Sequence, residues 1–153
     1  MSAPLQILVD ADACPVKEEI YRVARRYGLP VHVVANAFIQ IPQEPLIARV
    51  IVDAGPDAAD DWIAERAVPR SIVVTADIPL AGRCLDAGAE VLGPRGDPFT
   101  HDSIGAALAG REIGEHLRSM GVVTSGPKPF AAADRSRFLQ ALDAAVHRAK
   151  RKM

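Results

Sequence analysis

The sequence has few cysteines, few aromatic residues and almost no net charge. Cys14 and Cys84 are far apart and form no CxxC pair, which argues against a zinc ribbon, a thioredoxin-type motif or a disulfide framework, so we expect both to be reduced. Aromatic residues make up only 5% of the chain, which leaves few platforms for base stacking. The formal net charge of -1 gives no overall attraction to nucleic acid. Such a partner would therefore need a local basic patch or bound metal ions.

The chain also lacks long apolar runs and paired metal-binding histidines. No stretch reaches the roughly 18 apolar residues of a membrane span, and the N-terminus has no basic region followed by an apolar one, so a cytoplasmic protein without a membrane partner is expected. The four histidines form no HExxH or similar pattern, so a zinc site is not expected. With 49% hydrophobic and 24% charged residues, the 153 residues fit a single globular domain.

Apolar runs alternate with segments of helical spacing along the chain. Because strand, helix and strand follow one another within about 30 residues, the pattern predicts βαβ units. The whole order predicts an α/β fold, a three-layer α/β/α sandwich with a mostly parallel central sheet. The expected strands are 5–9, 31–35, 46–52, 71–75 and 89–92, and the expected helices are 15–27, 57–67, 77–88, 101–120 and 134–150.

Carboxylates follow three of the expected strands at the point where each strand ends. Since the carboxyl ends of parallel strands share one edge of a sheet, acids that are distant in sequence can meet there. A close group of carboxylates is stabilised by a hard divalent cation such as Mg²⁺ or Mn²⁺, which can activate water for attack on a phosphodiester. The pattern therefore favours metal-dependent hydrolysis of nucleic acid. The acids concerned are Asp10 and Asp12, then Asp53, Asp57, Asp60 and Asp61, then Asp77.

Helix capping explains some of these acids without a metal. Asp57, Asp77 and Asp134 each stand where an acid can satisfy the free N–H groups of a helix N-terminus. Asp10 is harder to explain in this way, because several residues separate it from the helix expected to begin at Pro15. On the second helix, Asp57 and Asp61 share a face, whereas Asp60 and Asp61 diverge by about 100°.

Several strings in the sequence resemble one known family. They are VDADACPVK, VVAN, GPDAADDWI, VVTADIPLA, and GPKPF followed by DRSRFLQALD. They resemble the bacterial YaiI/YqxD family, which is placed within the PIN-like nuclease superfamily, and the resemblance covers nearly the whole chain. It implies a PIN-like sandwich and a site for Mg²⁺ or Mn²⁺. The matching positions are Asp10, Asp57 or Asp61, and Asp77, with Asp12 as a further ligand.

The sequence hypothesis is thus a metal-dependent ribonuclease. Asp10, Asp12, Asp61 and Asp77 are the expected catalytic residues, and Asp57 joins them as a candidate metal ligand. Thr75 is expected to contact a ligand or a ligating carboxylate, and Lys17 and Lys128 are candidates for phosphate contacts, although exposed lysines are often only solvated charges. The basic C-terminus, HRAKRKM, is either a phosphate-binding patch or a solvated tail.

Two other functions fit parts of the same pattern. Asp10-Ala11-Asp12 after a strand resembles the DxD motif of phosphatases whose first aspartate is a nucleophile. The second alternative is a non-catalytic RNA-binding or assembly module, in which the acids cap helices or bind a structural metal. The sequence does not indicate an oligomeric state.

Overall fold

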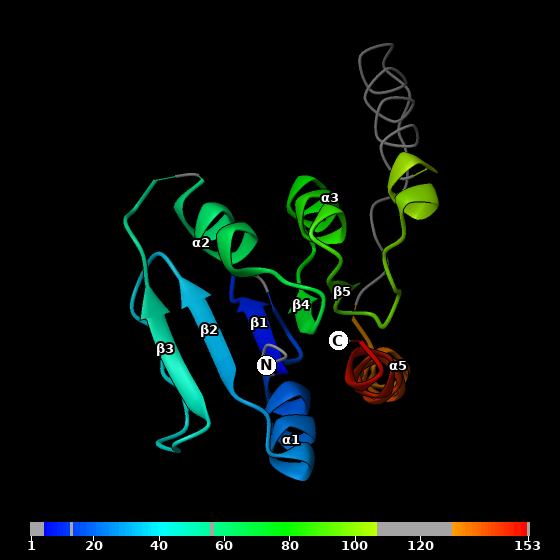
Figure 1. The fold of residues 1–153 in the computed structure, drawn as a ribbon. Helices are drawn as coiled ribbons and strands as arrows, with labels where there is room; N and C mark the ends of the chain where they lie inside the picture. The colour runs from blue at the N-terminus through cyan, green and yellow to red at the C-terminus, as the bar shows by residue number, and fades with distance from the viewer. Residues whose placement is uncertain (1–4, 13, 56, 107–129, 153) are drawn as a thin grey trace, which may run out of the picture.

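The computed structural model describes residues 5–12, 14–55, 57–106 and 130–152. Within them, five parallel strands form one sheet in the order β3-β2-β1-β4-β5 (Figure 1). The sandwich predicted from the sequence is confirmed. The strands are β1 (Gln6–Asp10), β2 (Val31–Ala35), β3 (Ile47–Ile51), β4 (Ser71–Val74) and β5 (Glu90–Leu92). The helices are α1 (Lys17–Tyr27), α2 (Ala58–Arg66), α3 (Ile78–Asp86) and α5 (Ala132–Lys150), and residues 101–106 are also helical.

Helices cover both faces of the sheet. α1 and α5 lie on one face and α2 and α3 on the other (Figure 1). In the central strand β1, Ile7 and Val9 face the core under α1 and α5, while Leu8 faces the core under α2 and α3. All three side chains have no exposed surface. A strand buried on both faces must be apolar at every position, which explains why β1 reads as a continuous run rather than an alternating one.

Two helix boundaries differ from the sequence prediction. α1 begins at Lys17, because Pro15 and Val16 form a turn before it. α5 begins at Ala132, so Asp134 is not its N-cap. The Asp134 carboxylate instead accepts a hydrogen bond from the backbone N–H of Ala131 at 2.9 Å, which still satisfies a free donor at the start of the helix. Of the helix expected at 101–120, the part beyond residue 106 lies outside the described residues.

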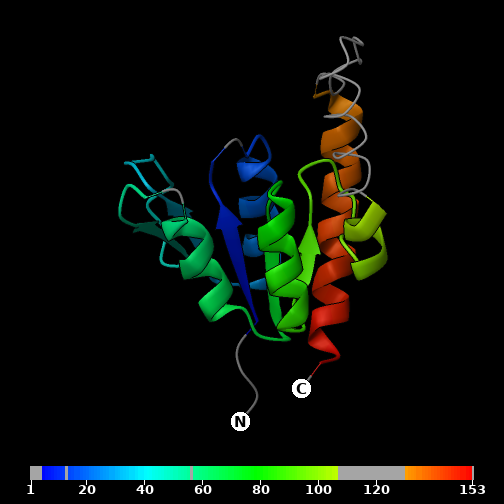
Figure 2. The same cartoon turned by 90° about the horizontal axis from the view of Figure 1, so that it is seen from above.

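The two ends of the strands differ in chemistry. At the amino ends, Glu90 pairs with Arg148 and with Lys152, whose Nζ also donates to the carbonyl of Gly88. The basic C-terminal end of α5 therefore lies at the edge opposite to the strand arrowheads (Figure 2). The acids that follow β1 and β4 lie at the other edge. In the part of the chain that the structure describes, no helix is both long enough and apolar enough to span a bilayer.

Candidate functional site

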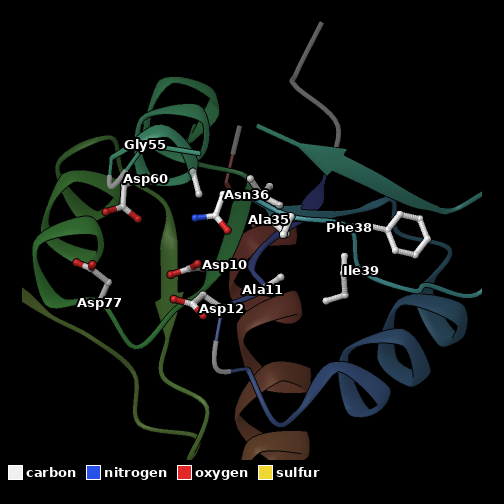
Figure 3. Close-up of a pocket in the computed structure, with 13 residues that line it drawn as sticks. Asp10, Ala11, Asp12, Ala35, Asn36, Phe38, Ile39, Gly55, Asp60 and Asp77 are labelled. Atoms are coloured by element: carbon white, nitrogen blue, oxygen red, sulfur yellow. The ribbon is translucent and has the colours of Figure 1, made fainter. Parts of the chain in front are cut away.

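A pocket of about 300 Å³ opens at the carboxyl ends of β1 and β2. Among the described residues that line it, the charged ones are all aspartates: Asp10, Asp12, Asp60 and Asp77. Asp10 ends β1, Asp12 follows it, Asp60 lies in the first turn of α2, and Asp77 precedes α3. Figure 3 shows these four side chains on one side of the pocket and Phe38 on the other. Three segments distant in sequence thus bring their acids to one cavity, as the topology predicts.

Thr75 connects two of these acids. Its hydroxyl donates a hydrogen bond to Oδ2 of Asp10 at 2.8 Å and accepts one from the backbone N–H of Asp77 at 3.0 Å. The Thr75 side chain is almost fully buried, with 2% of its surface exposed. From the sequence, Thr75 is expected to contact a ligand or a ligating carboxylate, and in the structure it contacts the carboxylate of Asp10. Thr75 fixes how the Asp10 carboxylate is presented to the pocket.

Asp77 caps a helix and lines the pocket at the same time. Its Oδ1 accepts a hydrogen bond from the backbone N–H of Leu80 at 3.0 Å, at the N-terminus of α3. The capping interpretation and the site interpretation of Asp77 are therefore compatible, because one carboxylate oxygen serves the helix while the side chain faces the cavity (Figure 3).

Burial and mutual repulsion make it unfavourable for all four aspartates of the pocket to be ionised at the same time. Burial raises the pKa of Asp10, and the charges of Asp12 and Asp77 raise it further, against the opposing effect of the hydrogen bond from Thr75. The pKa of Asp60 rises to about 6, first because of burial and then because of repulsion from Asp77, Asp10 and Asp57. The cavity thus concentrates negative charge, and a bound cation would reduce the repulsion between the carboxylates.

The second cluster of acids is arranged differently from the sequence prediction. Of Asp57, Asp60 and Asp61, only Asp60 lines the pocket. Asp61 is exposed and pairs with Arg83 at 2.8 Å, and Asp57 is exposed at the start of α2. The burial of Ile63 accounts for this choice, because Asp60 stands three residues before Ile63 and so shares its face of α2.

Of the two predicted phosphate contacts, the structure describes only Lys17. Lys17 is not among the residues that line the pocket, and its ammonium donates to the carbonyl of Cys14 at 2.8 Å. Lys128 lies outside the described residues. Cys14 and Cys84 are both free thiols, as expected. Asn36 and Phe38 also line the pocket, from the loop after β2. The apolar residues of the segment 36–45 favour a loop that covers part of the site or a partner surface rather than a merely solvated one, and the pocket lining agrees with the first of these.

The four aspartates line one cavity but do not form a closed coordination shell. Among residues 5–12, 14–55, 57–106 and 130–152, no three His, Cys, Asp or Glu side chains converge closely enough to hold a metal ion directly. Magnesium usually takes one or two carboxylates from a protein and keeps several water molecules. A cavity of this size lined by aspartates can supply such a partial shell.

Comparison with known proteins gives consistent matches along the chain. A family model described as "Uncharacterized BCR, YaiI/YqxD family" matches residues 8–148. A UPF0178 protein of Caulobacter sp. (strain K31) is 63% identical over 145 residues, which cover 95% of this chain and 96% of that protein. A UPF0178 protein of Rhodopseudomonas palustris (strain HaA2) is 60% identical over 151 residues, covering 99% of this chain and 92% of that protein. No solved structure matches significantly.

Proposed function

We propose that this chain, which belongs to the YaiI/YqxD family, is a hydrolase that uses Mg²⁺ or Mn²⁺ to cleave phosphodiester bonds in RNA, with a PIN-like site. One observation carries the proposal. Four aspartates from three segments line a single cavity at the carboxyl edge of the sheet, where burial and then repulsion by neighbouring acids raise the pKa of Asp60 to about 6. Carboxylates packed at this energetic cost are a common feature of functional sites.

The donor set suits a hard divalent cation. Carboxylate oxygens are the ligands that Mg²⁺ and Mn²⁺ prefer, whereas zinc and copper favour the nitrogen and sulfur ligands that are absent from the described lining of this pocket. One or two of Asp10, Asp60 and Asp77 would bind the ion directly, and the other acids, including Asp12, would bind it through water molecules. Phosphate oxygens would fill the remaining positions. The bound ion would supply an activated water and charge stabilisation for the displaced oxygen.

The chain's own residues hold and orient the reacting groups. Thr75 fixes the Asp10 carboxylate through Oδ2, and the start of α3 fixes Asp77 through Oδ1. Each acid therefore keeps one oxygen that these bonds do not engage. Asp60 supplies a further carboxylate to the same cavity from the first turn of α2. Asp12 is an exposed residue of the cavity lining and would assist in binding the ion.

The test is binding of Mn²⁺ and Mg²⁺ by calorimetry, with cleavage of a labelled single-stranded RNA measured in parallel. Wild type is expected to bind the ion saturably and to cleave only when it is present, and Asp10→Asn is expected to lose both. Asp61→Asn is the matched control, because Asp61 is an exposed acid outside the pocket. It should retain ion binding and cleavage.

Two outcomes would contradict the proposal. Absence of ion binding by wild type would favour a non-catalytic module whose acids serve as caps. Turnover of p-nitrophenyl phosphate without cleavage of RNA would favour a phosphatase, in which the Asp10-Ala11-Asp12 segment supplies the nucleophile.

A further inference from the structure

Phe38 is unusually exposed for a large aromatic side chain in a protein with so few aromatic residues. Its relative exposure is 71%, whereas Phe138 is fully buried in the core. Phe38 lines the acidic pocket on the side opposite to the aspartates (Figure 3). An exposed aromatic ring at the rim of a polar cavity is a candidate contact for a ligand rather than for the protein core.

The chain holds Phe38 in this exposed position. The next residue, Ile39, packs against the core cluster under α1 and α5, so the backbone directs Phe38 outward. Arg49, on the edge strand β3, donates a hydrogen bond to the carbonyl of Ile39 at 3.1 Å. Arg49 is paired with Val33 in the ladder between β3 and β2, so the sheet fixes the backbone position of Arg49.

Arg49 also defines which face of the ring is open. Its guanidinium lies over the Phe38 ring, with 4.4 Å between the Arg49 Cζ atom and the ring centroid. With one face covered by a cation and 71% of the residue still exposed, the open surface is the opposite face and the ring edge. The pair thus presents a flat apolar surface with a positive charge directly behind it, beside a cavity whose described charged residues are all acidic.

We infer that Phe38 and Arg49 form a base-binding subsite, in which one unpaired base of the substrate stacks on the open face of Phe38. The inference rests on the proposed function, because it concerns the substrate of the same pocket. Stacking on an aromatic ring requires a base that is free of its neighbours, and it tolerates any base because each has a π-face. Arg49 attracts the adjacent phosphate and counters the repulsion by the aspartates. Phe38 therefore positions the strand so that a neighbouring phosphate reaches the acidic side of the pocket.

The test compares two fluorescein-labelled octamers that carry the same number of phosphates. One is an oligoadenosine RNA and the other an abasic analogue of equal length. Their affinities are measured by fluorescence anisotropy in buffer without divalent cations, because the proposed function predicts that wild type cleaves the RNA when Mn²⁺ is present, and a gel afterwards checks that the probe is intact. Wild type is expected to bind the adenosine octamer about 5- to 150-fold more tightly than the abasic one, the range that corresponds to stacking of one base.

Three variants separate stacking from other effects. Phe38→Ala should reduce binding of the adenosine octamer to near the level of the abasic one and leave binding of the abasic octamer unchanged. Phe38→Trp should retain the preference. Ile51→Ala is the matched control, because Ile51 is the other large exposed apolar side chain among the residues that the structure describes, at 51% exposure, and it does not line the pocket. It should behave as wild type.

The result that overturns the inference is equal affinity of wild type for both octamers, or an unchanged preference in Phe38→Ala. A change in molar mass of Phe38→Ala by light scattering, without a change in octamer binding, would assign the surface to contact with a second copy of the chain and would also overturn it. Mn²⁺ calorimetry on the same samples separates the two proposals. If wild type binds Mn²⁺ but does not distinguish the octamers, only the subsite fails, whereas absence of Mn²⁺ binding contradicts the proposed function itself.

Discussion

Replacing Asp60 by Asn is expected to stabilise the metal-free protein at neutral pH. The reason is the position of Asp60, which is partly buried and is repelled by Asp77, Asp10 and Asp57, so that its pKa rises to about 6 from the ordinary 3.8. Asn is nearly isosteric with Asp but carries no charge. The substitution therefore removes the repulsion while keeping the shape of the side chain.

The magnitude follows from the pKa. A difference of about two pH units between the folded protein and an ordinary aspartate corresponds to about 3 kcal/mol of unfavourable interaction with the ionised form. Water reaches this partly exposed side chain and screens it, so we expect about 1–2 kcal/mol to be recovered. In a domain of this size that gain raises the melting temperature by about 3–6 °C.

The pH dependence has a defined sign. The folded protein binds a proton on Asp60 more tightly than the unfolded chain does, so the stability of wild type falls as the pH rises from about 3.8 to about 6. The advantage of Asp60→Asn is then fully present above about pH 6 and disappears below about pH 4. Thermal unfolding followed by circular dichroism in EDTA, from pH 4 to pH 8, measures this difference. Addition of Mn²⁺ should reverse the order at pH 7, because wild type gains binding energy that the variant has lost.

Asp61→Asn supplies the contrast within the same helix turn. It breaks only an exposed pair with Arg83, which is worth about 0–1 kcal/mol, so it should leave stability unchanged or slightly reduced. If Asp60→Asn were destabilised at pH 7 in EDTA, or if both variants changed alike, the repulsion inferred for the pocket would be refuted.

Three further changes test how the fold supports the site. Thr75→Val removes the hydrogen-bond donor to the Asp10 carboxylate. It should lower the free energy of unfolding, measured in urea, by about 1–3 kcal/mol and weaken Mn²⁺ binding. Thr75→Ser keeps the hydroxyl and should preserve both properties. Gly96→Ala should lower the free energy of unfolding by about 3 kcal/mol or more, because φ is +88° and the new Cβ would lie 2.9 Å from the α5 backbone. Gly28→Ala should lower it by only about 1 kcal/mol in the same urea measurement, because φ is +67° but the space around the new Cβ is open. Glu90→Gln should lower the urea midpoint at pH 7. Burial opposes ionisation of Glu90, but its two cationic partners lower its pKa overall, so their stabilisation is present above about pH 4.5 and the difference from wild type should shrink as the pH falls below it.

The order of the elements could be predicted because each has a strong local cause. The apolar runs of β1 and β4 are continuous because both faces of these strands are buried, and Gly28 with Pro30 ends α1 at a fixed point. Boundaries were less certain where several residues can cap a helix. Asp134 has the chemistry of an N-cap, yet α5 starts two residues earlier and uses the same carboxylate from inside its first turn.

The sequence by itself determined that Asp10, Asp12 and Asp77 would come together, because each follows a buried strand and all parallel strands end at the same edge. Only the tertiary structure decided between Asp57, Asp60 and Asp61. That choice depends on how far α2 is rotated about its axis, and packing of Ile63 against the sheet turns Asp60 into the pocket and leaves Asp61 to pair with Arg83. The pairing of Phe38 with Arg49 was likewise invisible in the sequence, because it depends on the register of β2 against β3 rather than on either segment alone.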